Sequence, residues 1–445
     1  MQEVLGIILA GGVGQRLYPL TRDRAKPAVP FGGIYRIIDF TLSNSVNSGL
    51  RRLYILTQYK QQSLSRHIRQ GWHLMQPDLD EFIEILPPQQ RIGEEWYRGT
   101  ADAVYQNLFT FEQERFDYAL ILSGDHIYKM NYKLMLDFHR AKMADATVAV
   151  IEVAREDAHQ FGVVAADEEG LVRGFEEKPA DPKPLPHDPD RSLVSMGVYV
   201  FNRDTLLRAL VENGENPSSG HDFGRDILPK LIKSHRVYGF NFRDENKGAA
   251  KYWRDIGTLD AFYEANMDLI AVTPVFNLYD REWPLRTNAL QLPPAKFIFS
   301  EDGKRMGVAL DSTVSHGCVI SGGRVQHSVL SHGVRLECYS EVEDSILFPD
   351  VTVGRHARVR GAIIDTGVVI PEGTVIGFDA ESDRERFTVT EKGRIVVTSA
   401  DLKCDQLRGR DSCAKRSLET ITLCHAPKCS PRGSARLENS GVNLK

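Results

Sequence analysis

The chain has 445 residues, which is enough for two domains and a third small piece. Its 42% apolar and 26% charged residues are ordinary for a soluble globular protein, and its formal net charge of −5 argues against a nucleic-acid-binding surface. No apolar run approaches the roughly 20 residues that a membrane span needs, so we expect neither a nucleic acid nor a membrane as a partner.

The first predicted element is the unbroken apolar run Val4–Ala10. Such a run is typical of a strand that is buried on both faces of a parallel sheet. The N-terminus has neither a basic region nor a small-residue cleavage site, so we interpret the run as a strand and not as a signal peptide.

A glycine-rich loop follows this strand directly, in the stretch LAGGVGQRL from Leu9 to Leu17. Its glycines allow a tight turn and bring backbone N–H groups close to a ligand, and Arg16 adds a positive charge. This combination favours an anion, above all a polyphosphate. The Walker loop is excluded because no Gly-Lys-Ser/Thr ending follows Gly14, and the dinucleotide fingerprint is excluded because it needs a glycine in place of Leu17. A glycine-rich turn without a ligand would look the same, so other segments must decide.

Strands and helices then alternate, which predicts a Rossmann-like α/β domain with a mostly parallel sheet. The predicted elements are the strands Leu53–Thr57, Tyr118–Ser123 and Ala146–Val153 and the helix Asn131–Ala144. Ligands of such sheets bind beyond the carboxyl ends of the strands. Because Gly11 follows one such end and Asp125 follows another, we expect a phosphate loop and a carboxylate at the same edge of the sheet.

Two proline-rich stretches interrupt this pattern. Pro179–Arg191 holds five prolines and is an exposed loop by composition. The break Pro274–Pro294 ends in LPPAKF and marks a domain boundary.

A seventeen-residue repeat follows the second break. Apolar residues recur at this spacing in three series, which are Val308, Val325, Val342, Val359 and Ile376; Val319, Leu336, Val353 and Ile370; and Val334, Val351 and Val368. Turn-like triplets at Ser331–Gly333, Phe348–Asp350 and Asp365–Gly367 keep the same spacing. Short β runs with a turn at each corner predict a left-handed parallel β-helix, in which each coil buries its face against its neighbours.

The segment from Cys404 to Lys445 is basic and shows no periodicity, so we expect a disordered extension. It holds four of the six cysteines and the motif CHAPKC, whose irregular spacing makes a zinc site the weaker interpretation. No cysteine precedes Cys318, which fits a reducing cytoplasm.

Several further segments carry groups suited to a site. They are Lys26-Pro27, WYRGTADA (Trp96–Ala103), FEEKP with Lys178, SMGVYVF from Ser195, which we expect to be a polar turn entering a strand, and YWRDIGT with Asp255. Each has an ordinary structural explanation on its own, because a lysine is usually solvated, an aspartate near a glycine usually caps a turn, and Trp253 is most simply a core residue.

Together these segments resemble a known family. LAGGVGQRL…AKPAVPFGG, RIIDFTLSN, WYRGTADA, SGDHIY, EKP and YWRDIGT are similar to the motifs of the bacterial glucose-1-phosphate adenylyltransferases, also called ADP-glucose pyrophosphorylases, from about Leu5 to about Ala400. The glycine loop alone indicates only the wider sugar nucleotidyltransferase group, whereas RIIDF and WYRGTADA indicate the ADP-glucose branch. The chain then divides into a nucleotidyltransferase domain (1–273), a linker (274–295), a β-helix domain (296–400) and a tail (401–445).

The resemblance implies that ATP and glucose 1-phosphate are converted to ADP-glucose and pyrophosphate, for glycogen synthesis. The sugar phosphate attacks the α-phosphorus of ATP, so the protein must position two anions and neutralise their charge. By resemblance, Asp125 and Asp255 hold Mg²⁺, and Arg16 and Lys26 neutralise the triphosphate as pyrophosphate leaves. Lys178 would grip the phosphate of glucose 1-phosphate.

The resemblance also assigns the other substrate contacts. Those expected for glucose 1-phosphate are Tyr97, Gly162, Glu177, Lys178 and Ser195. Those expected for the nucleotide are Leu9, Ala10, Gly11, Gly12 and Gln90.

Family members respond to small-molecule allosteric effectors at anion sites between the domains and form homotetramers, and the resemblance implies both here. The residues in segments that resemble the effector sites are Arg24, Arg36, Arg384 and Arg386, with ordinary surface charge as the alternative. The chain departs from the pattern at Asp23, where some members carry a lysine, and at Ser399, where some carry an arginine. A carboxylate at Asp23 would repel a phosphorylated activator.

Three alternatives stay open. Left-handed β-helices often belong to acyltransferases, and histidines without a shared repeat position lie in the predicted β-helix at His316, His327, His332 and His356. A non-catalytic regulatory subunit would be expected to lose a metal carboxylate or the phosphate lysine, but this chain keeps Asp125, Lys178 and Asp255. A sister enzyme that uses UTP or dTTP would keep all the phosphate-handling residues.

Overall fold

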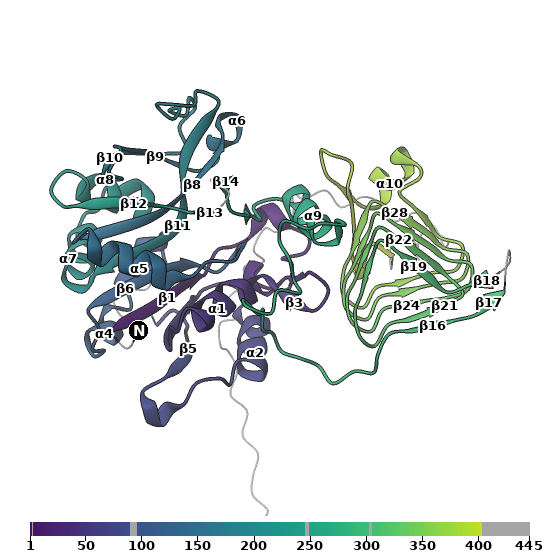
Figure 1. Cartoon of the computed structure of the whole chain (residues 1–445). Coiled ribbons are helices and arrows are strands. Elements are labelled where there is room, and N and C mark those ends of the chain that lie inside the picture. Colours follow the sequence, from purple (N-terminus) through teal and green to yellow (C-terminus); the bar gives the residue numbers. More distant parts are fainter. Residues whose placement is uncertain (2, 90–95, 245–248, 302–304, 403–445) are drawn as a thin grey trace, which may run out of the picture. The chain divides into compact units, whose positions relative to one another are not determined.

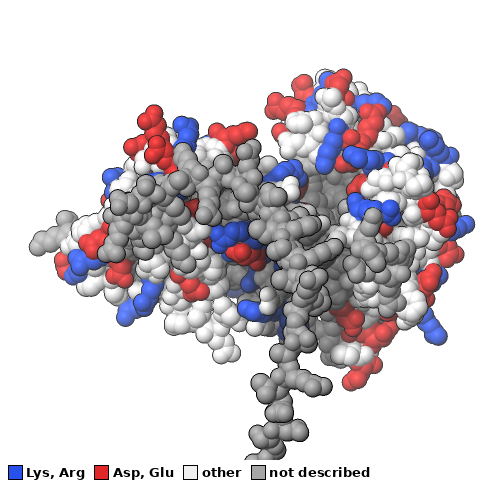
Figure 2. Space-filling view, turned by 180° about the vertical axis from the view of Figure 1, so that it is seen from behind, with Lys and Arg blue, Asp and Glu red and all other residues white. Residues whose placement is uncertain are grey.

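The computed structural model describes residues 1–402, apart from positions 2, 90–95, 245–248 and 302–304. Figure 1 shows the described elements of this unit in sequence colours. Gln90 and the cysteine-containing segment from Cys404 onward lie outside the described residues. Among the described residues, no helix combines the length and the apolar character needed to cross a membrane. On the face shown in Figure 2, basic and acidic side chains are interspersed.

A nine-stranded sheet is the centre of the first part of the chain (Figure 1). Its order is β10-β9-β11-β6-β1-β4-β5, and β8 pairs with β11 and β12. The strands are β1 (Val4–Ala10), β4 (Arg52–Thr57), β5 (Phe82–Leu86), β6 (Tyr118–Ser123), β8 (Ala146–Ala154), β9 (Gly162–Ala166), β10 (Val172–Glu177), β11 (Arg191–Asn202) and β12 (Val237–Asn241). Because β6, β1, β4 and β5 run parallel, their carboxyl ends share one edge of the sheet.

The predicted mostly parallel α/β sheet is confirmed, except that β10, at one edge, and the long strand β11 run in the opposite direction. This long strand lies between β6 and β8 and runs antiparallel to both. An apolar strand that is buried on both faces has the same sequence pattern in either direction, so the antiparallel strand carried no separate signal. The register shifts between Ser195 and Tyr199, which makes the expected polar turn at Ser195 wrong: this residue lies within β11, next to a bulge that changes where side chains point.

Helices cover both faces of this sheet. Apolar residues of α1 (Ile37–Asn47), α2 (Gln61–Gly71) and α5 (Tyr132–Ala141) join one core cluster with Val4 and Ile8 of β1. Apolar residues of α3 (Thr100–Tyr105), α4 (Leu108–Glu112), α7 (Arg203–Gly214) and α8 (Leu228–Leu231) join a second cluster with Leu5 and Ile7. Alternate residues of β1 therefore belong to opposite faces, as expected of a doubly covered strand. The other helices are α6 (Arg155–Ala158), α9 (Leu259–Met267) and α10 (Ala380–Arg386).

Short antiparallel pairs complete this part of the chain. They are β2 (Pro30–Phe31) with β3 (Tyr35–Arg36), β7 (His126–Tyr128) with β15 (Trp253–Asp255), and β13 (Arg243–Asp244) with β14 (Ala249–Ala250). The proline-rich loop predicted at Pro179–Arg191 connects β10 to β11. Residues 271–295, all of which are described, form no helix or strand.

Three sheets form the predicted β-helix, shown in green in Figure 1, and they are parallel apart from the antiparallel pair β32–β33. The first contains β16 (Lys296–Ile298), β21 (Val319–Ser321), β24 (Arg335–Leu336), β27 (Thr352–Val353) and β30 (Val369–Ile370). The second contains β19 (Val308–Leu310), β22 (Arg324–Gln326), β25 (Glu341–Glu343), β28 (Arg358–Arg360) and β31 (Val375–Ile376). The third contains β20 (Thr313–Val314), β23 (Val329–Leu330), β26 (Ile346–Leu347), β29 (Ala362–Ile364), β33 (Ile395–Val397) and β32 (Thr388–Val389). A hairpin of β17 (Ser300–Glu301) and β18 (Arg305–Met306) follows β16.

The predicted register is correct in the middle coils and wrong by one residue in the first. Val325, Val342, Val359 and Ile376 pair in succession, as the seventeen-residue spacing predicts. In the first coil, however, Ile320 and not Val319 pairs with Leu336, and Ala309 and not Val308 pairs with Val325. This coil is thus one residue shorter than the seventeen-residue coils that follow it. Because residues 319 and 320 are both apolar, the spacing of apolar residues did not reveal the difference.

Candidate functional site

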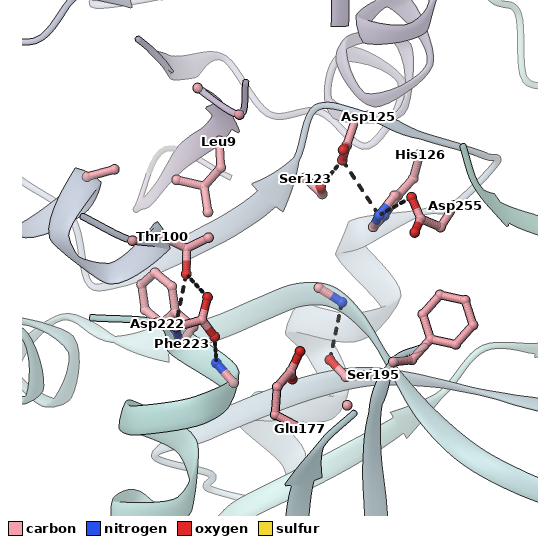
Figure 3. Close-up of a pocket in the computed structure, with 18 of the residues that line it drawn as sticks. Leu9, Thr100, Ser123, Asp125, His126, Glu177, Ser195, Asp222, Phe223 and Asp255 are labelled. Atoms are coloured by element: carbon pink, nitrogen blue, oxygen red, sulfur yellow. Dashed lines mark hydrogen bonds and ion pairs between the residues drawn. The ribbon is translucent and has the colours of Figure 1, made fainter. Parts of the chain in front are cut away.

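A cavity of about 530 Å³ opens at the carboxyl edge of the sheet. The predicted site residues that line it are Leu9, Gly11, Gly12, Arg16, Lys26, Tyr97, Asp125, Gly162, Glu177, Lys178, Ser195 and Asp255. Ala10 is buried at the end of β1. Residues from widely separated segments therefore meet in one place, and Figure 3 shows labelled side chains on opposite sides of this space.

The glycine loop leaves β1 along one wall of the cavity. Gly14 adopts a left-handed conformation (φ 70°), and its carbonyl accepts a hydrogen bond from Thr21 Oγ1 at 2.8 Å. A β-carbon at Gly14 would lie 3.2 Å from the β-carbon of Lys26, so the loop packs closely on the segment that supplies this lysine. In contrast, a β-carbon at Gly12 would meet no atom of the described chain within 4 Å. Packing does not require a glycine at position 12, and its absent side chain leaves room for a ligand.

Two carboxylates share one buried lysine at the same end of the cavity. Lys26 Nζ lies 2.7 Å from Asp125 Oδ2 and 3.5 Å from Asp255 Oδ1. His126 Nε2 lies 3.6 Å from Asp125 Oδ1 and 3.8 Å from Asp255 Oδ1, and Figure 3 shows the three side chains converging. Ser123 Oγ donates a hydrogen bond to Asp125. We call Lys26, Asp125, His126 and Asp255 the carboxylate cluster.

Pairing of two short strands explains why the distant aspartates meet. Asp125 immediately precedes β7, and Asp255 ends β15. In the antiparallel register of these strands, Asp255 lies directly opposite His126. Two backbone segments are thus joined by main-chain hydrogen bonds beside the carboxylates, which limits how far the carboxylates can separate.

Opposite charges shift the pKa values of Lys26 and Asp125 toward their ionised forms. Burial alone would lower the pKa of Lys26, but the charges of Asp125 and Asp255 outweigh burial and raise this pKa. Burial alone would raise the pKa of Asp125, but Lys26 and then His126 hold it well below its ordinary range. Arg16 adds a further positive charge near Asp255, since a β-carbon at Gly257 would lie 3.3 Å from Arg16 Nη1 and 3.2 Å from Asp255 Oδ2.

A third acidic group, Glu177, lies on the opposite side of the cavity (Figure 3). It pairs with Gly162 across β10 and β9. A β-carbon at Gly162 would lie 2.9 Å from Glu177 Oε2, and one at Gly224 would lie 2.7 Å from it, so both glycines make space for this carboxylate. Burial, and then the charge of Asp222, raise the pKa of Glu177.

The remaining predicted contacts surround Glu177. Lys178 has a left-handed backbone (φ 49°), which is uncommon for a residue with a side chain, and its side chain is 59% exposed. Its Nζ lies 3.8 Å from Glu177 Oε1. The Tyr97 hydroxyl accepts a hydrogen bond from Asn107 Nδ2 at 2.9 Å, and Ser195 Oγ accepts one from the Gly197 N–H at 3.2 Å. Strained backbone at a residue that lines a cavity is common at functional sites.

Two residues that lie next to the cavity carboxylates were not predicted from the sequence. His126 contacts Asp125 and Asp255, and Asp222 lies near Glu177. His126 stands next to Asp125 in SGDHIY, so its position in the motif was the available signal. Asp222 accepts hydrogen bonds from Thr100 Oγ1 at 2.9 Å and from the Gly224 N–H at 2.8 Å, and no sequence motif marked it. Trp253 also lines the cavity, and its buried Nε1 has no hydrogen-bond partner among the described residues.

The four arginines expected at effector sites lie in two places. Arg24 Nη2 forms an ion pair with Asp365 of the β-helix at 2.8 Å, and Arg36 Nη1 donates to the carbonyls of Ala28 and Ser63 at 3.4 and 3.3 Å. Burial lowers the pKa of Arg36. Arg384 and Arg386 belong to the last turn of α10, and Arg386 lies over the Phe387 ring.

The β-helix histidines occupy separate places. His327 contacts Asp344 at 2.6 Å, His356 stacks on Tyr339 with ring centroids 4.9 Å apart, and His316 stacks on His332 at 6.3 Å. The last pair shares a repeat position after all, because the first coil is short.

Among the described residues, no group of three or more His, Cys, Asp and Glu side chains is arranged to hold a metal ion.

Comparisons with known proteins agree with this architecture. Residues 5–272 match the family model described as "Nucleotidyl transferase", and residues 293–397 match "GlmU-like, C-terminal hexapeptide", which is consistent with a left-handed β-helix.

Curated relatives cover nearly the whole described chain. A protein of Koribacter versatilis is 59% identical over 400 residues, covering 89% of this chain and 96% of the relative. A protein of Rhodopirellula baltica is 54% identical, covering 90% of this chain and 91% of the relative, and one of Methylococcus capsulatus is 52% identical, covering 89% and 93%. Each is named glucose-1-phosphate adenylyltransferase. The chain therefore belongs to the glucose-1-phosphate adenylyltransferase family.

Proposed function

We propose that this protein transfers the adenylyl group of ATP to glucose 1-phosphate, giving ADP-glucose and pyrophosphate for the synthesis of glycogen or a related α-glucan. The names of the relatives support the reaction. The observation that carries it is the carboxylate cluster, in which Lys26 lies 2.7 and 3.5 Å from Asp125 and Asp255 beside the glycine loop. Such a cluster suits the transfer of a nucleotidyl group between two phosphate-bearing anions, whose charge must be neutralised.

The reaction needs no protein nucleophile. A phosphate oxygen of glucose 1-phosphate forms a bond to the α-phosphorus of ATP, and the bond from this phosphorus to the α,β-bridging oxygen breaks, so that pyrophosphate leaves with the electron pair. The protein must then hold both substrates in line and stabilise the charge that develops on the leaving group.

Asp125 and Asp255 would hold a divalent cation, which we propose to be Mg²⁺. The donor set fits, because Mg²⁺ is commonly bound by one or two carboxylates together with substrate phosphates, and the two carboxylates line the cavity as a pair without a third protein ligand among the described residues. When bound, the cation would neutralise phosphate charge. Lys26 keeps the two like charges close together while ATP is absent.

The wall formed by Leu9, Ala10, Gly11 and Gly12 is the proposed nucleotide subsite, and Gln90 is assigned to it by resemblance. The backbone of this loop follows the buried strand β1, which gives the subsite a rigid support. Arg16 and Lys26 would counter the charge of the triphosphate and then of the departing pyrophosphate.

Glucose 1-phosphate would occupy the side of the cavity around Glu177. The exposed Lys178 is proposed to bind its phosphate, and Glu177 and Ser195 its hydroxyl groups, with Tyr97 and Gly162 shaping the subsite. Carboxylate and hydroxyl oxygens are suited to sugar hydroxyls, which both donate and accept hydrogen bonds.

Regulation, assembly and location are further parts of the proposal. Arg24, Arg36, Arg384 and Arg386 would bind anionic effectors, and the chain would form a homotetramer. The four-part division at 273, 295 and 400 stays a proposal, as does action in the cytoplasm, where ATP and sugar phosphates are available.

A pyrophosphate-release assay tests this function. ATP, UTP, dTTP and GTP are each combined with glucose 1-phosphate and with other sugar phosphates in the presence of Mg²⁺, and the sugar nucleotide is identified by mass spectrometry. We expect ATP with glucose 1-phosphate to be preferred. Preference for UTP or dTTP would favour the sister enzymes, no turnover would favour a regulatory subunit, and acyl transfer from acetyl-CoA would favour the acyltransferase alternative.

A further inference from the structure

Helix α1 is unusual because it is buried and polar at once. It begins in the motif RIIDFTLSN, and all its residues from Ile37 to Ser45 are buried. Buried hydroxyl, amide and carboxylate groups are costly unless each finds a hydrogen-bond partner. Asp39 accepts hydrogen bonds from His67 and Trp72, and Ser45 donates to a carbonyl of the helix itself. The partners of the amide groups and of Thr41 lie in two other segments, and their arrangement shows what the helix does.

One side of α1 binds the backbone of the segment that carries Asp125. Thr41 Oγ1 donates to the Ser123 carbonyl at 2.8 Å, two residues before Asp125. Asn44 Nδ2 donates to the Tyr128 carbonyl at 3.0 Å, and Asn44 Oδ1 accepts from the Met130 N–H at 3.2 Å. These bonds hold residues 123–130 at both ends, with Asp125 and β7 between them.

Another side of the same helix binds the segment that precedes the β-helix. Asn47 Nδ2 donates to the Pro284 carbonyl at 2.9 Å, and Asn47 Oδ1 accepts from Arg286 Nη1 at 2.6 Å. Asn44 takes part here too, because its Oδ1 also accepts from Trp283 Nε1 at 2.9 Å. Asn44 is thus the residue of α1 whose side chain bonds both segments, while Asn47, one turn away, bonds only the second.

We propose that Asn44 is a positioning residue for adenylyl transfer, an inference that rests on the proposed function. Its carboxamide fixes the end of β7. Since β7 is joined to β15 by backbone pairing, this also fixes the distance between Asp125 and Asp255. Asn44 itself is fully buried and is not among the residues that line the cavity. Without its amide, the buried Tyr128 carbonyl and Met130 N–H would lose their partners, and β7 would shift to recover them.

The consequence for catalysis is selective. A displacement of about 1 Å at a catalytic group can cost about 100-fold in rate, whereas binding of the substrates depends mainly on the glycine loop and on the residues around Glu177. Loss of Asn44 should therefore lower kcat far more than it raises either KM.

The experiment compares Asn44→Ala with Asn47→Ala, a matched control on the same helix with the same side chain. A second test variant, Thr41→Val, removes the hydrogen bond at the other end of the segment while conserving volume. Steady-state kinetics give kcat and both KM values, and hydrogen exchange without metal or substrate follows the peptide that spans residues 123–132. We expect Asn44→Ala and Thr41→Val to lower kcat at least about tenfold with KM changes below about threefold, and to speed exchange in that peptide. Asn47→Ala should stay within about twofold in kcat and leave that exchange unchanged.

Equal decreases of kcat in Asn44→Ala and Asn47→Ala, or a rise in KM without a decrease of kcat, would overturn the proposal. If Asn44→Ala does not fold, Thr41→Val decides, and a kcat within twofold of the unsubstituted protein would refute it. An unsubstituted protein that makes no ADP-glucose would instead refute the proposed function, and the exchange comparison would still report whether Asn44 holds β7.

Discussion

Asp255 lies directly opposite His126 in the antiparallel pair of strands β15 and β7. This relationship joins two parts of the chain that are far apart in sequence, and it brings Asp255 and Asp125 within reach of the same Lys26 ammonium group. A lysine between two carboxylates occupies the kind of place that a divalent cation needs, and this lysine holds the pKa of Asp125 well below its ordinary range.

Lys178→Ala should raise the KM for glucose 1-phosphate at least about tenfold and change the KM for ATP little, because one charge-assisted bond to a phosphate is worth about 1.5–3 kcal/mol. The side chain is exposed to the cavity, so the fold should be unaffected. Initial rates with each substrate varied in turn measure both constants. An equal rise in both would place the lysine in another role.

Protonation of Glu177 should cause the loss of activity on the acidic side of the pH–rate profile. Burial and Asp222 raise the pKa of Glu177, whereas Lys26 lowers that of Asp125, so Glu177 is the first of the two to be protonated as the pH falls. We expect kcat/KM for glucose 1-phosphate to decline through the Glu177 pKa. In Glu177→Gln this decline should vanish and leave only that of the substrate phosphate, whose second pKa is about 6. An unchanged pH profile in the variant would contradict this assignment.

The same shift predicts an effect on stability with a definite sign. A raised pKa in the folded protein means that Glu177 binds its proton more tightly there than in the unfolded chain. Its favourable contribution is therefore present below the unfolded pKa and lost as the pH rises through the folded pKa. The change in Tm caused by Glu177→Gln, measured by calorimetry as variant minus unsubstituted protein, should therefore be more positive at pH 7 than at pH 4. The opposite order would show that the folded protein favours the ionised form.

The register of the first β-helix coil can be tested by two alanine variants. Ile320 is fully buried and stacks on Leu336, while Val319 is half-buried and lies opposite Arg335. Ile320→Ala should cost about 2–5 kcal/mol of unfolding free energy, and Val319→Ala clearly less. Denaturant titration of both variants gives the comparison. A larger cost at Val319 would restore the seventeen-residue register that spacing alone predicts.

The ion pair between Arg24 and Asp365 should limit the response to anions. Asp365→Asn removes the negative charge that Arg24 contacts at 2.8 Å, and so leaves the guanidinium more available to an anionic effector. With inorganic phosphate as the probe, we expect the concentration for a half-maximal change in activity to fall severalfold, with basal kcat within twofold. Glu341→Gln, which breaks the exposed ion pair with Arg358, is the control and should leave the phosphate response unchanged. An unaltered response in Asp365→Asn would argue against an effector role for Arg24.

Elements whose sequence signal is local could be predicted to the residue. Val4–Ala10 and Tyr118–Ser123 are strands with the predicted bounds, because an unbroken apolar run limited by polar residues leaves little choice of where a buried strand ends. The spacing of Val325, Val342 and Val359 also predicted the coils correctly, because each of these valines pairs with the equivalent valine of the next coil.

Features that depend on pairing between distant segments could not be predicted in this way. The strand pair β7–β15 is only three residues long on each side and mixes polar with aromatic residues, so nothing in either stretch marks the other as its partner. The same holds for Ser195, whose place at a bulge depends on the two strands that flank β11. Asn44 is the clearest case. From the sequence alone a polar helix residue is expected to face solvent, and its burial is explained only by its hydrogen bonds to the Tyr128 carbonyl and the Trp283 indole.

The most direct test of the account is a double-mutant cycle on Asp125→Asn and Asp255→Asn, with kcat measured at saturating ATP and glucose 1-phosphate. If both carboxylates hold one cation, either substitution alone removes most of its contribution, so each should lower kcat about 100- to 1,000-fold and the double variant little further. ATP affinity and the circular dichroism spectrum should change little in all three variants. Losses that multiply, with the double variant slower by the product of the two single effects, would show that the aspartates act independently and would contradict a shared cation site.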